Sequence, residues 1–352
     1  MSRNVLAPTT QRMSNNRNYR VNMVHDDFGG SSKWNAANEK ISKGYEEPDL
    51  YADDDYEEDI AECDIEQLSN GNYKLALHVP KSFYGGLIGF KGSTKRRIET
   101  ESQTEIHVPR QNDSSTVLII QSNDRKNVCA ALRKIRLLVD SLRKRMKPTH
   151  FLAAPLNTGE VQIRFNELKQ SILDAQLPGI DEDLFVSERC IHLTLGVYVL
   201  LDDAERQKAI TELNACREWL TDLRTPFEIK IKGLEIMNDD PSSTKVLYAH
   251  VESPNLQVFA DKCLNHFQST GLCATDNIER DSIKLHMTVL NARNRKEKVN
   301  KNDRNCFDAR EILKRFGDFD FGTAQCNEVH MCVLNSSRDV DDFYKITGTL
   351  KF

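Results

Sequence analysis

The amino-acid sequence predicts an α+β protein in which an acidic tail precedes two folded domains. Segments with the two-residue period of strands alternate with segments that have the three- and four-residue steps of helices, from residue 73 onward. The 352 residues suffice for two domains plus a tail. The sequence His-x-Thr occurs twice, beginning at His192 and at His286, and both copies lie in apolar, β-branched surroundings. The second domain is therefore expected to carry a repeated motif on two strands.

Residues 1–68 are polar, rich in Asn, Ser and Asp, and lack a sustained hydrophobic period. Such a segment buries too little apolar surface to fold, so we expect a largely disordered tail. Residues 46–66 hold twelve Asp and Glu and no Lys or Arg. The few apolar residues in this acidic run either form a short docking segment or stay solvated, and the sequence favours neither.

Charge is distributed unevenly along the chain. Residues 71–150 contain sixteen Lys and Arg but only six Asp and Glu, although the whole chain has a formal net charge of -5. A folded domain with so basic a surface suits a polyanion, and nucleic acid is the expected partner. The run Arg143–Arg145 by itself could instead be the solvated face of a helix.

Nine cysteines are scattered without a Cys-x-x-Cys pair, which argues against a disulfide framework and against a zinc site. No apolar window approaches a transmembrane span, and the N-terminus lacks a signal core. We therefore expect a soluble intracellular protein with no membrane partner, no metal and no cofactor. Four cysteines lie in apolar-periodic segments and are expected in the core: Cys129, Cys190, Cys216 and Cys263.

The first folded domain is expected to cover residues 69–147. Its pattern predicts a strand, a short amphipathic turn or helix, a glycine-containing loop, a helix, two strands and a long helix. Ser93 can cap the first full helix, and Asp124 can open the last. The expected segments are 73–79, 81–88, the loop Gly89–Gly92, 94–103, 104–108, 116–121 and the helix from residue 124.

This order of elements around the loop Gly89–Gly92 resembles a type I KH domain, an RNA or single-stranded DNA module, over residues 72–146. The resemblance implies that the glycines let the backbone approach the phosphates of about four nucleotides. Many members have two polar or basic residues between the glycines, whereas this chain has Phe90 beside Lys91. A KH fold kept only as a scaffold is the alternative. The residues expected to contact nucleic acid are Gly89, Phe90, Lys91, Gly92, Lys95, Arg96 and Arg97.

The second domain is expected over residues 148–352. A helix, a His-x-Thr strand, a helix and two strands follow one another roughly twice, which predicts two related lobes. Residues 293–304 are charged and are expected to form a flexible loop. Besides the two His-x-Thr strands, the pattern predicts strands at 150–156, 227–237, 245–251, 328–334 and 343–352, and helices at 161–173, 203–223, 254–271 and 307–316.

In a strand, residues two apart point to one face, so His192 and Thr194 share a face, as do His286 and Thr288. Two imidazoles that titrate near neutrality can serve as a general base and a general acid. Two Thr hydroxyls can donate to an oxyanion. These four residues are the candidates for breaking a phosphodiester without a metal; the alternative is a chance repeat of a short motif.

Two further residues have ambiguous roles. Lys284 shares a face with His286, where it either contacts a phosphate or points to solvent at the strand end. His150 lies on a strand bordering the domain and is expected to be structural. The sequence does not distinguish which of the two motif histidines is the acid.

Two His-x-Thr strands in a bilobal, pseudo-symmetric α+β domain resemble the two-histidine (2H) phosphoesterase superfamily, which includes RNA ligase-like proteins and cyclic phosphodiesterases. A KH domain directly before such a domain resembles one family of transcription-coactivator subunits, and the stretches Thr149–Ala153 and Met237–Pro241 agree with it. The resemblance implies a protein of the nucleus, and also of the cytoplasm, that works beside a helicase in coactivation and DNA alkylation repair.

Three functions fit these features. The first is a metal-independent phosphodiesterase that acts on RNA ends or on 2′,3′-cyclic phosphates. The second is a module that binds RNA or a nucleotide without turnover. The third is an adaptor that recruits the helicase and other subunits of a complex, with RNA contact secondary.

Overall fold

The structure is a computed structural model, and its described residues are 10–12, 18–20, 64–110, 112–113, 115–274, 280–295, 306–334, 336 and 343–352. Near the N-terminus, β1 (Thr10–Arg12) and β2 (Asn18–Arg20) pair antiparallel in a unit of their own. The rest of the expected tail up to residue 63 lies outside the described residues. Within the described part of the chain, no helix is long and apolar enough to cross a membrane.

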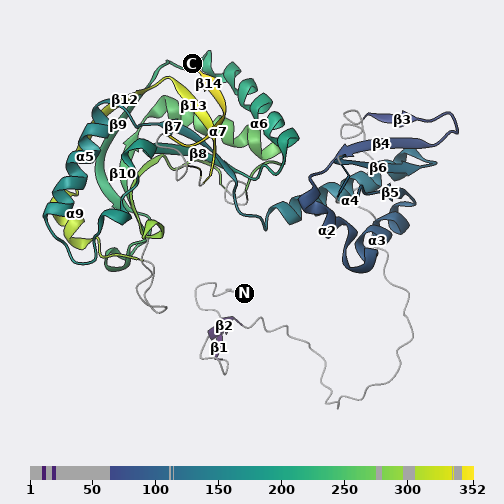
Figure 1. The fold of residues 1–352 in the computed structure, drawn as a ribbon, viewed down its shortest axis with the longest axis horizontal. Coiled ribbons are helices and arrows are strands. Elements are labelled where there is room, and N and C mark those ends of the chain that lie inside the picture. Colours follow the sequence, from purple (N-terminus) through teal and green to yellow (C-terminus); the bar gives the residue numbers. More distant parts are fainter. Residues whose placement is uncertain are drawn as a thin grey trace, which may run out of the picture. The chain divides into compact units, whose positions relative to one another are not determined.

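The domain that follows contains a four-stranded antiparallel sheet in the order β3-β4-β6-β5 (Figure 1). Its first strand, β3 (Ile65–Gln67), lies in the stretch expected to belong to the tail and adds an edge strand beside β4. The sheet therefore begins before residue 69. The other elements are β4 (Tyr73–His78), α2 (Tyr84–Ile88), α3 (Ser93–Ser102), β5 (Glu105–His107), β6 (Val117–Ser122) and α4 (Arg125–Arg143).

Helix α4 packs on this sheet through the apolar stripe that its sequence predicts. Val128, Leu132 and Ile135 are buried at three- and four-residue steps. Asp124 caps the helix as expected, because its carboxylate accepts a hydrogen bond of 2.9 Å from the Lys126 amide. Local sequence and packing therefore agree on where this helix starts and which face it buries.

The start of α3 differs from the expected one. Ser93 is the first helical residue and is not the cap; the capping position is Gly92, in a left-handed conformation without a side-chain hydrogen bond. A left-handed turn favours glycine because it has no Cβ to clash. No capping side chain therefore offsets the positive end of the helix dipole at this loop.

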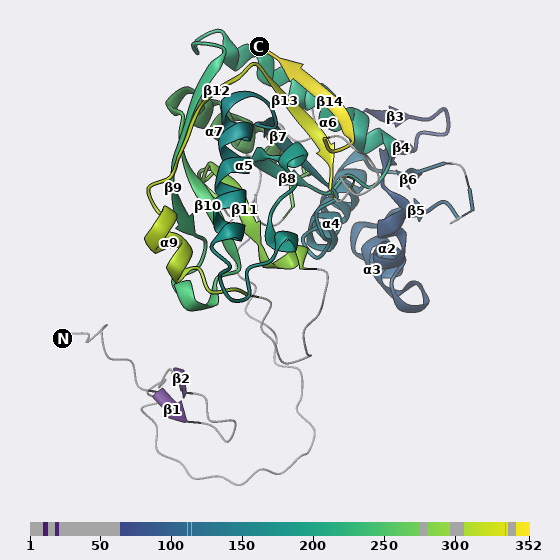
Figure 2. The ribbon, with the colours of Figure 1, turned by 60° about the vertical axis from the view of Figure 1, so that its left-hand side comes forward.

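The second domain is built on one eight-stranded antiparallel sheet in the order β12-β9-β10-β11-β8-β7-β13-β14 (Figure 2). β11 and β8 are the central pair, so each half of the sheet contributes four strands, as a bilobal domain requires. The halves are not the sequential repeats expected from the sequence, because β9 and β10 join the half of β11 and not that of β8. The strands are β7 (His150–Pro155), β8 (His192–Tyr198), β9 (Phe227–Ile236), β10 (Val246–Glu252), β11 (His286–Asn291), β12 (Asp320–Cys326), β13 (Glu328–Val333) and β14 (Ile346–Lys351).

Helices cover this sheet toward both of its edges (Figure 1): α5 packs against β12, α6 against β14, and α7 against β8 and β9. They bury the apolar side chains of the sheet in one large core, to which the expected cysteines Cys216 and Cys263 belong. Cys129 and Cys190 are buried as well. The helices are α5 (Gly159–Asp174), α6 (Asp203–Ala215), α7 (Pro254–Ser269) and α9 (Arg310–Phe316).

Two expectations about these elements need correction. The helix expected over 203–223 is α-helical only to Ala215 and continues as a 3-10 turn to Leu220. The sequence pattern does not predict β12, because only Phe321 and Cys326 are buried among its seven residues. This edge strand is set by its backbone pairing with β9 more than by its own apolar period.

A buried ion pair joins the last residue of α4 to the second domain. Arg143 and Glu205 are each 5% exposed, and both guanidinium Nη atoms donate to the Glu205 carboxylate. Arg143 also donates to the Val199 carbonyl and lies 5.0 Å from the centre of the Phe83 ring. Glu205 accepts a further bond of 2.8 Å from the Leu201 amide. Arg143 is therefore a buried anchor and not part of a solvated basic face.

Substitution of Arg143 by Ala should lower the free energy of unfolding by about 3–5 kcal/mol, because it leaves the Glu205 carboxylate buried without its counter-charge. The double variant Arg143→Met, Glu205→Leu should lose less, since it removes both charges together. Urea denaturation followed by circular dichroism compares the three proteins. A single variant as stable as the parent would contradict the anchoring role.

Candidate functional site

The two His-x-Thr segments form the strands at the centre of the sheet. β8 and β11 pair antiparallel with Leu193 opposite Met287, and both of these side chains are fully buried. In an antiparallel pair, residues on either side of such a partnership also oppose one another. His192 therefore lies across from Thr288, and His286 across from Thr194, on the face away from the core.

Both strands carry the same irregularity after the Thr. In β11, the register with β10 shifts so that Val289 is an extra residue, and Val289 and Leu290 are both buried. In β8, the register with β7 shifts at the corresponding place, and Leu195 and Gly196 are both buried. Such bulges re-aim the side chains that follow them. The two halves of the sheet are thus related around β8 and β11.

The two imidazoles are held in the same way. His192 Nδ1 lies 2.7 Å from the carbonyl oxygen of Cys190, and His286 Nδ1 lies 2.8 Å from that of Lys284. Because a carbonyl oxygen only accepts, Nδ1 carries the proton in both rings. The neutral imidazole then has its lone pair on Nε2, at the opposite side of the ring, where it can take a proton.

His192 is enclosed by aromatic side chains. The ring centres of Phe151, Tyr344 and Phe343 lie 5.0, 5.2 and 6.3 Å from that of His192. Burial, with a smaller contribution from the nearby His286, lowers the pKa of His192 to about 4, although the hydrogen bond to the backbone opposes the shift. His192 is therefore neutral at pH 7.

His286 has polar neighbours. The Tyr248 ring packs edge-on at 5.4 Å, and its hydroxyl bonds both the Glu235 carboxylate and the Lys284 ammonium. The Lys284 Nζ atom lies 4.7 Å from the centre of the same ring. Burial is the main cause that lowers the pKa of His286, and the charges of Lys284 and Arg280 add to it against the backbone hydrogen bond.

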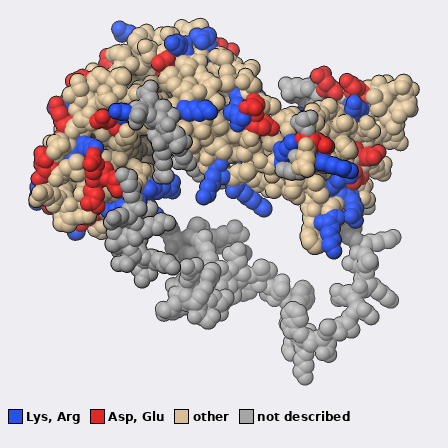
Figure 3. Space-filling model, in the orientation of Figure 1, with Lys and Arg blue, Asp and Glu red and all other residues tan. Residues whose placement is uncertain are grey.

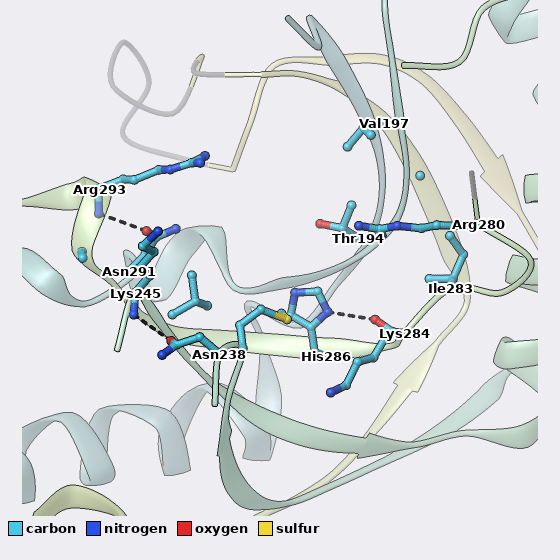
Figure 4. A pocket seen from close by; sticks show the side chains of 14 residues that line it. Thr194, Val197, Asn238, Lys245, Arg280, Ile283, Lys284, His286, Asn291 and Arg293 are labelled. Carbon is cyan, nitrogen blue, oxygen red and sulfur yellow. Dashed lines mark hydrogen bonds between the residues drawn. The ribbon is translucent and has the colours of Figure 1, made fainter. Parts of the chain in front are cut away.

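A cavity of about 640 Å³ opens beside His286 (Figure 4). Of the candidates from the sequence, Thr194, Lys284 and His286 line it. His192 and Thr288 share the strand face but are not among its lining residues. Four cationic side chains line the cavity: Lys245, Arg280, Lys284 and Arg293. The arrangement suits an anionic ligand beside a pair of imidazoles.

His150 lies apart from this cavity. It is buried on β7, with Nδ1 2.8 Å from the Thr149 hydroxyl, and burial together with the charge of Arg206 lowers its pKa to about 4. Its position fits the structural role expected of it. Among the described residues, no group of three or more His, Cys, Asp or Glu side chains could hold a metal ion.

The glycine loop of the first domain has the conformation that its sequence requires. Gly89, Lys91 and Gly92 have φ angles of 70°, 50° and 79°. A Cβ atom on Gly89 would lie 2.2 Å from the Thr94 hydroxyl and 2.9 Å from its backbone nitrogen, so only glycine fits. Phe90 is 82% exposed, and the Lys91 Nζ atom lies 5.4 Å from its ring centre. The loop tip thus presents an aromatic ring and a cation.

The cations of α3 are not equivalent. Lys95 forms an ion pair of 2.9 Å with Glu99, and Arg96 donates to the Lys91 carbonyl at 2.7 Å. Arg97 is exposed. Lys and Arg side chains gather over this helix in Figure 3. Arg96 therefore supports the loop, and Lys95 is partly neutralised.

The sequence pattern missed the residues that give the cavity its charge. Arg280 and Arg293 lie outside the strands, where no period marks them, and Lys245 begins the strand expected at 245–251, where nothing marked it as a site residue. The sequence did carry a signal for Tyr248, because the two-residue period of β10 places it on one face with His250. Only the tertiary structure shows that this face adjoins His286.

Comparison with known proteins agrees with both folds. Residues 148–352 match the family model described as "AKAP7 2'5' RNA ligase-like domain", and residues 74–137 match a KH domain. Over 351 residues the chain is 33% identical to activating signal cointegrator 1 complex subunit 1 of Mus musculus, which covers 92% of this chain and 96% of the mouse protein. The chain belongs to this family. In this cointegrator-subunit family member, the KH match covers most of the four-stranded sheet and the RNA ligase-like match covers the eight-stranded sheet.

Two solved structures are similar to parts of this family member. The first KH type I domain of human vigilin is 23% identical, with a TM-score of 0.21, and the match covers 22% of this chain and 81% of that domain. A structure described as a phosphoesterase is 16% identical, with a TM-score of 0.36, and the match covers 59% of this chain and 99% of that chain.

Replacing Lys284 by Met should raise the pKa of His286, because a neighbouring positive charge disfavours the imidazolium. The backbone carbonyl of residue 284 stays in place, so the hydrogen bond to Nδ1 is kept. NMR titration of the histidine side chains measures the shift, with His150 as an internal reference. An unchanged or lower pKa would show that the charge of Lys284 does not act on His286.

Changing Phe90 and Lys91 together to Asp should weaken binding of single-stranded RNA, because two carboxylates would face the phosphates in place of a cation. The loss should be largest at low salt and smaller as salt screens the repulsion. Fluorescence anisotropy with a short labelled RNA measures the affinity. Equal affinity at low and moderate salt would show that this loop is not the RNA site.

Proposed function

We propose that the protein is an RNA-binding, metal-independent phosphodiesterase. It acts on RNA ends or 2′,3′-cyclic phosphates through His192 and His286 as an acid–base pair. The observation that carries this proposal is the register of β8 and β11, which sets each imidazole across from the Thr of the other motif. A phosphate between the strands would meet both Nε2 atoms and both hydroxyls.

The environments of the two histidines suggest how the roles are divided. With a pKa of about 4, His192 is neutral at pH 7 and suits the base that takes a proton from water or from a ribose 2′-hydroxyl. His286 suits the acid that protonates the leaving oxygen. Thr194 and Thr288 would donate to the non-bridging oxygens, where negative charge is held. Lys284 would contribute charge at the same phosphate.

The mouse relative's name describes a subunit of the activating signal cointegrator 1 complex. We extend the proposal to this chain: it works in the nucleus, and also in the cytoplasm, as a subunit of such a complex. Its partners there are RNA, a helicase and the other subunits, in transcription coactivation and DNA alkylation repair. The KH domain supports the RNA part of this proposal.

One observation favours the alternative of a non-catalytic RNA- or nucleotide-binding adaptor. The pKa of both imidazoles is lowered, which in the ligand-free protein disfavours the protonated form that a general acid needs. A bound phosphate raises the pKa of a neighbouring His by favouring the charged form. Turnover therefore depends on whether the ligand restores the proton to His286.

His192→Ala should reduce turnover by at least about 10²-fold, the usual scale for loss of a general acid or base. The full-length protein is incubated in EDTA with short oligonucleotides that end in a 2′,3′-cyclic phosphate, a 3′-phosphate or a 3′-hydroxyl. Turnover that survives EDTA and is lost in the variant supports the proposal. Equal turnover in variant and parent would remove His192 from the mechanism.

The double variant His192→Ala, His286→Ala serves as the blank in the same assay. Loss of turnover with RNA affinity retained excludes unfolding as the cause. If no substrate is converted by the parent although RNA binds, the adaptor function replaces the enzyme.

A further inference from the structure

Two of the cations that line the cavity, Lys245 and Arg293, have no role in the proposed acid–base pair of His192 and His286. Lys245 precedes β10 and Arg293 follows β11, so both lie at the end of the cavity away from Arg280 (Figure 4). Because β10 and β11 run antiparallel with Val246 opposite Asn291, these two chain segments meet at one edge. The cavity thus has a second group of positive charge, separate from the one beside His286.

The bulge in β11 turns this end of the strand toward the cavity. Simple alternation would place Asn291 on the core face, opposite to His286 and Thr288. The extra residue Val289 shifts the alternation, so Asn291 is only partly buried and lines the same cavity as His286. The chain that carries Arg293 therefore leaves the sheet on the side of the candidate catalytic residues.

Backbone hydrogen bonds hold both cations in place. The Lys245 amide donates to the Asn238 side-chain oxygen at 3.2 Å, and the Arg293 amide donates to the Asn291 side-chain oxygen at 3.0 Å. The Ala292 amide donates to the Lys245 carbonyl at 2.9 Å, which ties the two segments together. The bases of both side chains are thus fixed before any ligand binds, and less ordering is needed on binding.

Lys245 and Arg293 differ from Lys284 in whether a carboxylate lies close to the side chain. Lys284 has a counter-charge in Glu235, at 3.7 Å. Within the described residues, neither Lys245 nor Arg293 has a carboxylate within ion-pair distance of its side chain. Two cations without a carboxylate partner at one end of a cavity favour an anionic ligand there. An anionic group of a ligand would supply the counter-charge that Lys245 and Arg293 lack.

That group is not the scissile phosphate. The β10 partners of His286 and Asn291 are His250 and Val246, which lie four residues apart, so the span is about 14 Å at about 3.4 Å per residue. One phosphate cannot contact both ends of this span. A ligand that fills the cavity therefore carries at least two anionic groups separated along its length, as an oligonucleotide does and a cyclic mononucleotide does not.

We propose that Lys245 and Arg293 form a second phosphate subsite, which holds a non-reacting phosphate of an RNA whose scissile phosphodiester lies between His192 and His286. This inference rests on the proposed function and adds a substrate class to it: oligonucleotides with a further phosphate beyond the reacting one. Arg suits this role because its planar guanidinium bonds two phosphate oxygens at once.

The probes are three diuridine compounds: UpU, pUpU with a 5′-phosphate, and UpUp with a 3′-phosphate, each in the 3′,5′ and the 2′,5′ linkage. Within each linkage, the three compounds share the central phosphodiester and differ only in the terminal phosphate. The full-length protein should convert one phosphorylated compound with a kcat/KM at least about tenfold above that of UpU, as a charge-assisted hydrogen bond warrants. The preference should shrink as salt rises, because released counterions contribute to it.

The variant Lys245→Ala, Arg293→Ala should bring this ratio close to one, mainly through KM. The matched control is Lys314→Ala, Arg315→Ala, which removes the same charge from the exposed side of α9, where neither residue lines the cavity. The control should keep the ratio of the parent. Since Lys245 and Arg293 are both exposed, the variant is expected to fold.

A parent without preference for either phosphorylated compound would overturn the subsite, and so would a preference that survives in the Lys245, Arg293 variant. If the parent converts none of the probes, binding decides the subsite, and the assay of oligonucleotide ends in EDTA decides the proposed function. Calorimetric titration with pUpU and UpUp then decides, in a background in which Phe90 and Lys91 are Asp. If the parent binds a phosphorylated compound more tightly than the variant Lys245→Ala, Arg293→Ala does, the subsite is supported. If the parent and the variant bind it equally, the subsite is overturned.

Discussion

The antiparallel register of β8 and β11 is the constraint on which the candidate site depends. Leu193 and Met287 meet at the centre of the eight-stranded sheet, and their burial fixes which side chains face outward. A slip by one residue would exchange the faces and send His192 and His286 into the core. The apolar halves of the two motifs are therefore as necessary to the site as the imidazoles and hydroxyls.

The two halves of the eight-stranded sheet are alike in their backbone and differ in their side chains. Both strands have the same order of outward and buried residues and the same bulge, yet Val197 stands where the other half has Asn291. Phe151, Phe343 and Tyr344 enclose one imidazole, whereas Tyr248 adjoins the other. The repeated strands thus give both imidazoles the same backbone hydrogen bond, whereas unequal surroundings place the cavity beside His286 and aromatic rings around His192.

The KH loop shows how a short motif is enforced locally. Gly89 is required because Thr94 leaves no room for a Cβ atom, and Gly92 because its φ angle is positive. Phe90 has no such constraint and is exposed at the tip, and Lys91 is exposed beside it with a positive φ of 50°. The glycines are therefore explained by the backbone, and the residues between them by whatever the loop contacts.

Apart from the edge strands β3 and β12, the sequence by itself determined the order of elements in both domains. It also determined the outward face of each His-x-Thr strand and the glycine loop, because these follow from local periods and backbone sterics. It did not predict β12, which has little apolar period and is placed by its pairing with β9. It also did not reveal Lys245, Arg280 or Arg293, since their segments meet only when distant strands pair. Whether the four motif residues catalyse stays a prediction, but their arrangement, and the depth at which each imidazole is buried, was decided by the tertiary structure.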